Sequence, residues 1–377
     1  SFYDKHLERD IDNGNHLLLS GNRSAKAYLD RINASGLMET APDARFAFAD
    51  IETGERWQVC MNNGPVPWWV MSPLRRIPGT SLGDYLQGAG LARAKQGQTV
   101  ADVIAGRGTM WSRFWEPLTL AVLNTTPERG EARLLWAAMA ETFARGGQHC
   151  LPMFAPTGLG NALVVPAERY LELRGERTMH QHALKSVETI ADRAMMLRFA
   201  NGRAVEVFPQ DKVILALPPT RLRMVLPDLD VPRDDAGILN AHFVVEDPDL
   251  TAGLPPITGL VNSTTHWAFV RGDVISLTIS AADRLGLMDA DPEDLAPKLW
   301  AETCIGLGLG NATYKAARIN KERRATFDQS SAEAAKRPAA RTRIKNLFLA
   351  GDATQTGLPA TIEGAIRSGE TAARLAA

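Results

Sequence analysis

The chain has 377 residues, of which 45% are hydrophobic and 23% are charged, a composition typical of a globular protein. Its 42 Lys and Arg residues nearly balance 43 Asp and Glu residues, and neither sign forms a long run. This balance excludes the basic surface by which proteins bind a nucleic-acid backbone, so no nucleic-acid partner is expected. The length predicts two domains, on the usual scale of roughly 100 to 200 residues each.

Three cysteines, Cys60, Cys150 and Cys304, are odd in number and far apart in the sequence. This pattern fits neither a disulfide framework nor a cysteine-based metal site, so we expect no metal and a reducing, cytoplasmic compartment. No uninterrupted apolar stretch reaches the roughly 18 to 20 residues that a membrane span needs. Any membrane contact of such a cytoplasmic protein is expected to be peripheral, at the inner face of the membrane.

The first half of the chain predicts a short α+β beginning followed by helices. Residues 24–36 show a helical pattern, and residues 46–61 alternate like a β-hairpin with its turn at residues 52–55. From residue 81 to residue 145, apolar residues recur at helical spacing. They do so in three stretches, VADVIAGRG, SRFWEPLTLAVLN and ARLLWAAMAETFARGG.

The second half predicts strands interrupted by helices. A helix is expected at residues 166–175, with Pro near its start and Gly just past its end. Strands are expected in HALKSVETIAD, MMLRFANGRAVEV and KVILALPP, and the run from Val213 to Leu217 is apolar enough to be buried on both faces of a sheet. Further strands between residues 238 and 279, a helix in PEDLAPKLWAETCIGLG and a last strand at residues 346–350 complete a mixed α/β (α+β) pattern.

The C-terminal segment NLFLAGDATQTGLPATIEGAIRSGETAARLA reads as a strand, a polar loop and a helix. The strand ends at Gly351 and Asp352, and Pro359 is expected in the first turn of the helix. Glycine costs about 1 kcal/mol relative to alanine inside a helix, so Gly364 and Gly369 predict close packing against another backbone or a flat ligand. Unpaired N–H groups at the helix start can stabilise negative charge, and a carboxylate can accept hydrogen bonds from sugar hydroxyls. The segment suits a dinucleotide cofactor; an ordinary strand, turn and helix at the end of a sheet is the alternative.

The stretch LFLAGDATQTGLPATIEGAIRSG resembles the C-terminal flavin motif of the amine oxidase and phytoene desaturase superfamily. Within that superfamily the chain resembles the hydroxysqualene dehydroxylases of hopanoid biosynthesis, which are FAD-dependent oxidoreductases. Further segments carry the same resemblance, so that it spans nearly the whole chain. They are IDNGNHLLLSGN, PWWVMSPLRRIPGT, FWEPLTLAVLNT, ILNAHF, SLTISAAD and KERRATF.

The resemblance implies an FAD/NAD(P)-binding Rossmann-like domain interleaved with an α+β substrate domain. Residues 1–25, 145–225 and 340–377 would form the FAD-binding domain, and residues 26–144 and 226–339 the substrate domain. The superfamily opens with a strand, a GxGxxG turn and a helix that bind the pyrophosphate, and this unit does not precede Ser1. The FAD-binding domain is therefore expected to be incomplete at its N-terminus, which makes the chain a fragment or impairs its FAD binding.

The resemblance also assigns cofactor contacts, with FAD as the expected cofactor. Gly14, Asn15 and His16 would lie near the flavin, and the backbone of Val187 would meet the adenine. The ribityl chain and the pyrimidine ring would be cradled by residues of the C-terminal motif. These are Gly351, Asp352, Gly357, Leu358, Pro359, Ala360 and Thr361.

The implied activity is reductive dehydroxylation of hydroxysqualene to squalene, with an electron donor that the sequence does not identify. This reaction needs a hydride from the reduced flavin and an acid that helps the hydroxyl group to leave. Glu116 is the predicted acid, because it lies among apolar neighbours in FWEPL, where burial would raise its pKa. An exposed or capping carboxylate is the alternative for Glu116, and His16, His149 and His242 are further candidates.

Aromatic residues concentrate between residues 57 and 143. Most are expected in the hydrophobic core, and the alternative is an apolar tunnel for a long isoprenoid substrate. Two other functions stay open. The flavin motif is common to the whole superfamily, so a carotenoid (phytoene-type) desaturase or an amine oxidase is one. A truncated, non-catalytic lipid- or partner-binding remnant is the other.

Overall fold

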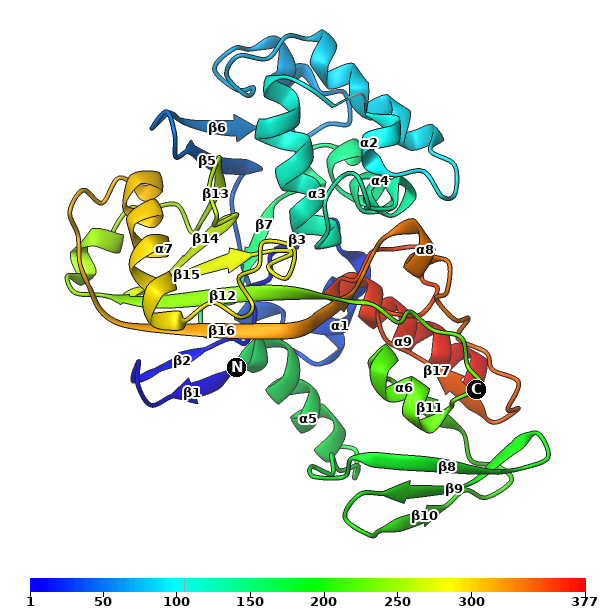
Figure 1. Ribbon diagram of the computed structural model, residues 1–377. Helices are drawn as coiled ribbons and strands as arrows, with labels where there is room; N and C mark the ends of the chain where they lie inside the picture. The colour runs from blue at the N-terminus through cyan, green and yellow to red at the C-terminus, as the bar shows by residue number, and fades with distance from the viewer. Residues whose placement is uncertain (105) are drawn as a thin grey trace.

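The computed structural model describes residues 1–104 and 106–377, and its largest sheet crosses the middle of the molecule (Figure 1). This sheet is mixed and has the strand order β16-β12-β15-β14-β13-β5-β6. β5 and β6 form the predicted hairpin, in which Phe48 pairs with Trp57, and β13 runs parallel to β5. The strands are β5 (Arg45–Asp50), β6 (Arg56–Cys60), β12 (Asp235–Val245), β13 (Ile257–Val261), β14 (Trp267–Arg271), β15 (Val274–Ile279) and β16 (Tyr314–Phe327).

One side of this sheet is covered by α7 (Pro292–Leu307), which confirms the helix predicted there. Asp291 caps its start by accepting a hydrogen bond from the Glu293 N–H, and Gly308 ends it in the left-handed conformation. The contact is aromatic, with Phe243 of β12 lying 5.1 Å from the ring of Trp300. This layer holds α7 and the sheet together as one core.

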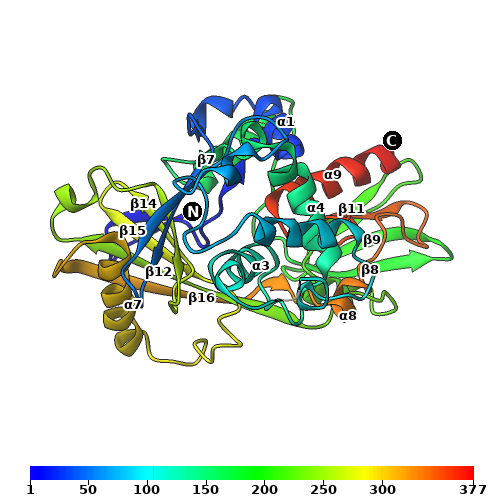
Figure 2. The same cartoon turned by 90° about the horizontal axis from the view of Figure 1, so that it is seen from above.

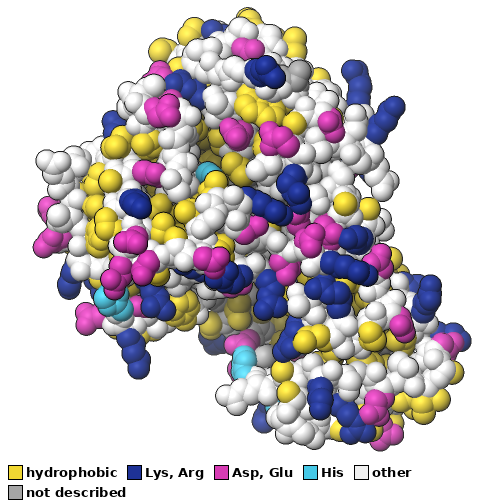
Figure 3. Space-filling view, viewed as in Figure 1, with side chains coloured by type: hydrophobic (Ala, Val, Ile, Leu, Met, Phe, Trp, Pro, Cys, Tyr) yellow, Lys and Arg dark blue, Asp and Glu magenta, His cyan; other side chains and the backbone are white. Residues whose placement is uncertain are grey.

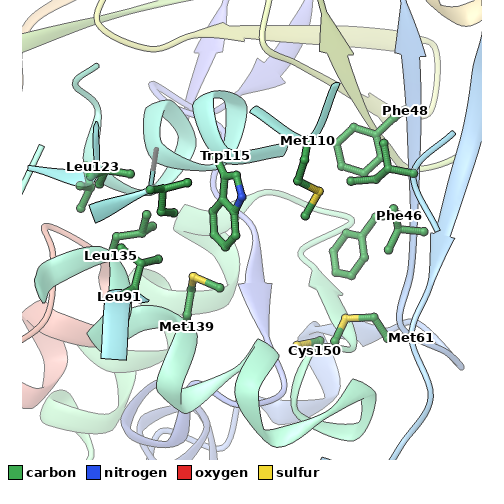
Figure 4. Close-up of a cluster of buried hydrophobic side chains, with 14 of the residues drawn as sticks. Phe46, Phe48, Met61, Leu91, Met110, Trp115, Leu123, Leu135, Met139 and Cys150 are labelled. Carbon is green, nitrogen blue, oxygen red and sulfur yellow. The ribbon is translucent and has the colours of Figure 1, made fainter. Parts of the chain in front are cut away.

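A block of helices covers the other side of the sheet, as predicted for residues 81–145. Trp115 is its largest fully buried side chain, and Phe46 and Phe48 of β5 pack into the same core (Figure 4). The predicted helical stretch VADVIAGRG includes Ala105, which lies outside the described residues. The elements are η2 (Trp68–Met71), η3 (Gly83–Arg93), α2 (Val100–Val103), η4 (Trp111–Trp115), α3 (Glu116–Leu123), α4 (Ala132–Glu141), η5 (Phe143–Arg145) and η6 (Gly147–His149).

A second region lies at the opposite end of the molecule from these helices (Figure 1). Its predicted strands are present, but they form two separate small sheets. β8 (Leu184–Ile190), β9 (Arg193–Phe199) and β10 (Ala204–Glu206) are antiparallel, and β11 (Val213–Leu215) pairs in parallel with β17 (Leu347–Leu349). The prediction that the run from Val213 to Leu217 is buried on both faces is wrong, because Ile214 is 42% exposed.

Helices lie between the second region and the large sheet with its helical block. Seen from above, α3 and α4 lie between the large sheet and α9 (Figure 2). The buried Glu363 of α9 accepts hydrogen bonds from the N–H groups of Ser24 and Ala25, so it caps the start of α1. The predicted helix at residues 24–36 ends earlier, at Arg31. The helices are α1 (Arg23–Arg31), α5 (Val165–Glu172), α6 (Pro219–Val225), α8 (Ser331–Ala334) and α9 (Ile362–Ala376).

Short elements complete the fold. They are the hairpin β1 (Phe2–Asp4) and β2 (Arg9–Ile11), the strands β3 (Leu18–Leu19), β4 (Glu39–Thr40) and β7 (Pro152–Phe154), and the single turns η1 (Ser35–Leu37), η7 (Gly160–Val164) and η8 (Pro248–Thr251). β7 pairs with both β3 and β4. The loop between β2 and β3, residues 12–17, lies beside the large sheet, and its residues 13–17 line a cavity.

Candidate functional site

A cavity of about 590 Å³ lies where the large sheet, the helical block and the start of α9 meet. The loop after β2 contributes Gly14, Asn15 and His16 to its wall. The far end of the chain contributes Leu358, Pro359, Ala360 and Thr361. The structure therefore brings together seven of the residues that the sequence predicts to bind the cofactor.

Four other predicted residues do not line this cavity. Gly351, Asp352 and Gly357 belong to the loop that precedes α9. Val187 lies in β8, where its half-buried side chain packs against the core under α6. Its predicted contact with adenine stays a prediction.

The C-terminal motif packs tightly against the end of β17. Gly351 has a φ of +112°, which glycine adopts readily, and its N–H donates a 2.7 Å hydrogen bond to Ser368 Oγ of α9. A Cβ at Gly364 would lie 2.9 Å from the Pro359 carbonyl oxygen, which confirms the close packing predicted for Gly364. At Gly369 a Cβ would meet no atom within 4 Å, so close packing against another backbone is wrong there.

Helix α9 begins at Ile362, and Thr361 caps it by accepting a 3.1 Å hydrogen bond from the Gly364 N–H. Pro359 precedes the helix, so the prediction that it occupies the first turn is wrong. The reason is local, because a threonine with extended backbone satisfies a first-turn N–H that proline cannot. Thr361, Ile362 and Glu363 all line the cavity, so the positive end of the helix dipole faces it.

Arg337, which the sequence reading did not single out, holds the loop before α9 from behind. Its Nη1 donates to the Leu358 carbonyl at 2.7 Å, and its Nη2 donates to the Asp352 carbonyl at 2.8 Å and to Thr356 Oγ1 at 2.9 Å. The guanidinium also lies 5.2 Å from the ring of Phe327. Burial lowers the pKa of Arg337 to about 10, and the nearby Asp352 partly opposes this. Burial likewise raises the pKa of Asp352, and Arg337 partly opposes that change.

Gln329 is a second residue that sequence reading missed. Its fully buried side chain donates a 2.8 Å hydrogen bond to the Leu123 carbonyl at the end of α3. The amide oxygen accepts a 2.8 Å hydrogen bond from the Ala360 N–H. Gln329 thereby ties the helical block to the residues just before α9, and it lines the cavity between them.

A polar network anchored on the buried Asn240 and Thr278 fixes the loop after β2. Asn15 Nδ2 donates to Thr278 Oγ1 at 3.1 Å, and Thr278 donates in turn to Asn240 Oδ1 at 2.9 Å. Asn240 Nδ2 closes the network by donating to the Asn13 carbonyl at 3.1 Å. Because these partners lie on the central strands β12 and β15, the loop is held in one position relative to the sheet.

Among the three histidine candidates, His16 alone lines the cavity. Surrounding protein atoms lower the pKa of His16, and Asp12 partly opposes this. The ring nevertheless remains accessible from the cavity. His242 is fully buried in β12 with its Nδ1 2.8 Å from Ser276 Oγ, and His149 lies half-buried in η6.

A second cavity of about 690 Å³ adjoins the first. Asn15, His16, Ile257 and Phe269 line both, so the two spaces meet at the loop after β2. Prolines and alanines supply much of the wall of the second cavity, and five charged residues also line it, Asp12, Glu39, Asp43, Arg45 and Arg271. At this junction Asn15 and His16 supply polar groups, and Ile257 and Phe269 supply apolar ones.

Four carboxylates in or near the cavity are candidates for the proton donor, and Glu116 is the one that the sequence predicts. Glu116 begins α3 and is half-buried, and burial followed by repulsion from Glu128 raises its pKa. It does not line the cavity, although the next two residues do. The other three line it: Glu141 and Glu363 pair with Arg367, and Glu322 accepts a 3.2 Å hydrogen bond from Asn13 Nδ2.

Residues 11–245 and 285–377 match the family model described as flavin containing amine oxidoreductase, and the chain belongs to this family. Its sequence is 40% identical over 375 residues to a hydroxysqualene dehydroxylase of Rhodopseudomonas palustris, covering 100% of this chain and 88% of that protein. It is also 40% identical over 376 residues to a hydroxysqualene dehydroxylase of Sinorhizobium fredii, with the same coverage.

Solved structures show the same fold. Putrescine oxidase bound to putrescine has a TM-score of 0.66 at 14% identity, over 97% of this chain and 88% of that one. Cyclohexylamine oxidase from Brevibacterium oxydans has a TM-score of 0.67 at 12% identity, over 97% and 87%. At this identity the likeness concerns the fold alone.

These matches confirm the predicted mixed α/β fold with a Rossmann-like FAD-binding domain, the oxidoreductase class and FAD as the cofactor. They also confirm the resemblance to hydroxysqualene dehydroxylases. The domain boundaries and the roles of individual residues stay predictions.

The residues present fit a flavin. The loop Gly14 to His16 and the N-terminus of α9 line the same cavity. The positive end of the α9 dipole could stabilise the negative charge that a bound, reduced flavin would carry. Gly14 to His16 and Leu358 to Thr361 would hold the ring between them.

Proposed function

We propose that the chain is an FAD-dependent hydroxysqualene dehydroxylase, which replaces the hydroxyl group of hydroxysqualene by hydrogen and yields squalene. The observation that carries the proposal is the 40% identity, over the whole chain, to relatives that bear this name. The site supports it, because a largely apolar cavity reaches the residues that would hold the flavin.

The apolar walls suit a long isoprenoid. Aromatic side chains line the first cavity from the sheet and from the helical block, among them Phe48, Phe114, Phe143 and Trp267. Each methylene that such walls bury contributes about 0.8 kcal/mol, so a hydrocarbon chain binds with few polar anchors. Both cavities fall within the roughly 300 to 1,000 Å³ of ligand sites, and together they accommodate two arms of a chain on either side of the junction at Asn15 and His16.

In the proposed reaction a C–O bond is broken, a C–H bond is formed, and the hydroxyl group leaves as water after it has gained a proton. Bound, reduced FAD would supply the hydride. The protein's own contribution is threefold. The apolar walls exclude bulk water, the polar network around Asn15 orients the hydroxyl group, and one acidic side chain delivers the proton.

Glu116 and Glu322 are the proposed alternatives for that acid. Glu116 has the raised pKa that a proton donor needs, whereas Glu322 has the position, because it lines the cavity beside Asn13. Glu116→Gln and Glu322→Gln separate them. The variant that lacks the proton donor should lose about 100-fold or more in turnover and show an altered pH profile. The turnover of the other variant should stay within a few-fold of that of the parent.

The substrate of this reaction is a lipid, and no helix among the described residues is long and apolar enough to cross a membrane. Because the substrate is a lipid, we propose that the enzyme meets it by peripheral contact with a bilayer. The electron donor is open.

The activity is tested by anaerobic incubation of the FAD-loaded chain with hydroxysqualene and a chemical reductant, followed by mass spectrometry of the lipid extract. Squalene is the expected product. Phytoene and putrescine serve as parallel substrates, since the first would be consumed by a carotenoid desaturase and the second by an amine oxidase. Turnover of either one without squalene formation would contradict the proposal.

A further inference from the structure

The segment from Val66 to Leu86 exposes an unusual number of large apolar side chains. It carries six of the 21 exposed large hydrophobic residues of the described chain. Trp68 is 68% exposed and Leu74 92%. We call this segment the crest; its exposed members are Val66, Trp68, Met71, Leu74, Leu82 and Leu86.

The crest is firmly seated on the helical block beneath it. Trp69 turns inward and meets Tyr85 edge to face, with 5.3 Å between the ring centroids. The Tyr85 hydroxyl accepts a 2.9 Å hydrogen bond from the N–H of Ile77, and Ile77 and Leu91 are fully buried in the core. The segment thus has its own inward anchors, so its outward apolar side chains are surplus to the packing of the chain itself.

The charged residues within the crest and just after it are mostly basic. The crest contains two basic side chains, Arg75 and Arg76, against the single acidic Asp84, and two more basic residues, Arg93 and Lys95, follow it in the sequence. Arg75, Arg93 and Lys95 are exposed. The chain as a whole has a formal charge of −1, so this basic excess is local. Apolar side chains rimmed by cations are complementary to an anionic lipid surface.

A second exposed apolar stretch, residues 164–179 around α5, lacks this complementarity. Its apolar side chains, such as Leu173, alternate with three glutamates and three arginines. Acidic groups so close to the apolar side chains would be repelled by an anionic surface. The crest is therefore the better candidate, and in the space-filling view it forms the top of the molecule, where yellow side chains stand at the rim (Figure 3).

We propose that the crest inserts into the surface of an anionic lipid bilayer. Trp68 would lie at the level of the head groups, Leu74 and Leu86 would enter the acyl region, and the basic side chains would contact lipid phosphates. The biological role of this docking rests on the proposed function, because an isoprenoid dissolved in the bilayer would pass directly from the membrane into an enzyme docked there. Lipid binding itself is independent of catalysis.

The test is flotation of the purified 377-residue chain with vesicles of phosphatidylcholine and phosphatidylglycerol. The parent chain should float with the vesicles, and more weakly with phosphatidylcholine alone or at high salt. The double variant Trp68→Ser with Leu74→Ser should lose about tenfold or more in vesicle partitioning. Arg75→Gln with Arg76→Gln should lose the preference for anionic vesicles and keep the residual binding.

Leu173→Ser with Met224→Ser is the matched control, since these side chains are also largely exposed, at 76% and 66%, but lie away from the crest. It should float like the parent. A parent chain that stays with the soluble fraction, or crest variants that float unchanged, would overturn the proposal. So would concentration-dependent self-association that the crest variants abolish in the absence of lipid, because the crest would then be an interface between two copies.

Turnover in detergent micelles keeps the two proposals apart. If the crest docks on lipid, its variants should convert micellar substrate at the parental rate while failing on vesicles. If the parent floats but forms no squalene in micelles, the proposed activity fails and the docking proposal stands.

Discussion

Arg337 holds the loop between Asp352 and Leu358, and replacing it by Met removes three hydrogen bonds while keeping much of the side-chain volume. Hydrogen bonds that involve a charged group contribute about 1.5 to 3 kcal/mol each. The carbonyl groups of Asp352 and Leu358 lose their partner, whereas removing a buried charge recovers part of its desolvation cost. We therefore expect Arg337→Met to lower the free energy of unfolding by about 3 kcal/mol.

The loss should extend to cofactor binding. A loop that is no longer held must be ordered when FAD binds, and ordering costs about 1 to 2 kcal/mol per residue. Arg337→Met should accordingly weaken FAD binding by about tenfold or more, which corresponds to at least ~1.4 kcal/mol. Urea unfolding of the apoprotein measures the stability, and quenching of flavin fluorescence measures the affinity.

Arg341→Met is the matched control, because Arg341 is exposed and its guanidinium lies 5.8 Å from the ring of Phe348. It should change the free energy of unfolding by no more than about 0.5 kcal/mol and leave FAD binding unchanged. The reasoning is refuted if Arg337→Met and Arg341→Met match each other in both stability and FAD affinity.

Three further predictions concern single buried groups. Burial raises the pKa of Asp352, so the ionised carboxylate destabilises the fold. Asp352→Asn should therefore make the apoprotein more stable to urea at pH 7, and this difference should vanish at acidic pH. The same variant should weaken FAD binding. Burial lowers the pKa of His242 to about 4, so its contribution to stability is present above the ordinary histidine pKa and is lost as the pH falls. The stability lost between pH 7 and pH 5 should be about 2 kcal/mol smaller in His242→Leu, and an unchanged loss would contradict this assignment. Gln329→Leu leaves two buried backbone groups unpaired and should cost about 2 to 4 kcal/mol in urea unfolding, whereas a cost below 1 kcal/mol would show that the tie is unimportant.

The parts of the site that the sequence predicted are those with a local signal. The C-terminal motif combines a strand, glycines and a helix start within one short segment, and the structure differs from its prediction only in details such as Pro359 and Gly369. The loop Gly14 to His16 has no such pattern, and its assignment to the flavin site rests on family resemblance alone. The structure agrees to the extent that this loop and the motif share one cavity.

The parts that the sequence did not reveal depend on distant partners. Arg337 and Gln329 are single polar residues whose importance comes from hydrogen bonds to backbone groups far away or across a loop. Strand β16 escaped prediction because its 14 residues are rich in Lys and Arg and mostly half-buried, which removes the apolar alternation of an ordinary strand. For Glu116, the neighbours in sequence indicated burial correctly, but they could not show that the side chain lies outside the cavity wall.

The most direct test of the central claim is a single turnover followed by flavin absorbance. The FAD-loaded chain is reduced under anaerobic conditions, freed of excess reductant and mixed with hydroxysqualene. The proposed function predicts that oxidised flavin reappears in the same molar amount as squalene is formed. Flavin that stays reduced, with hydroxysqualene recovered unchanged, would contradict it.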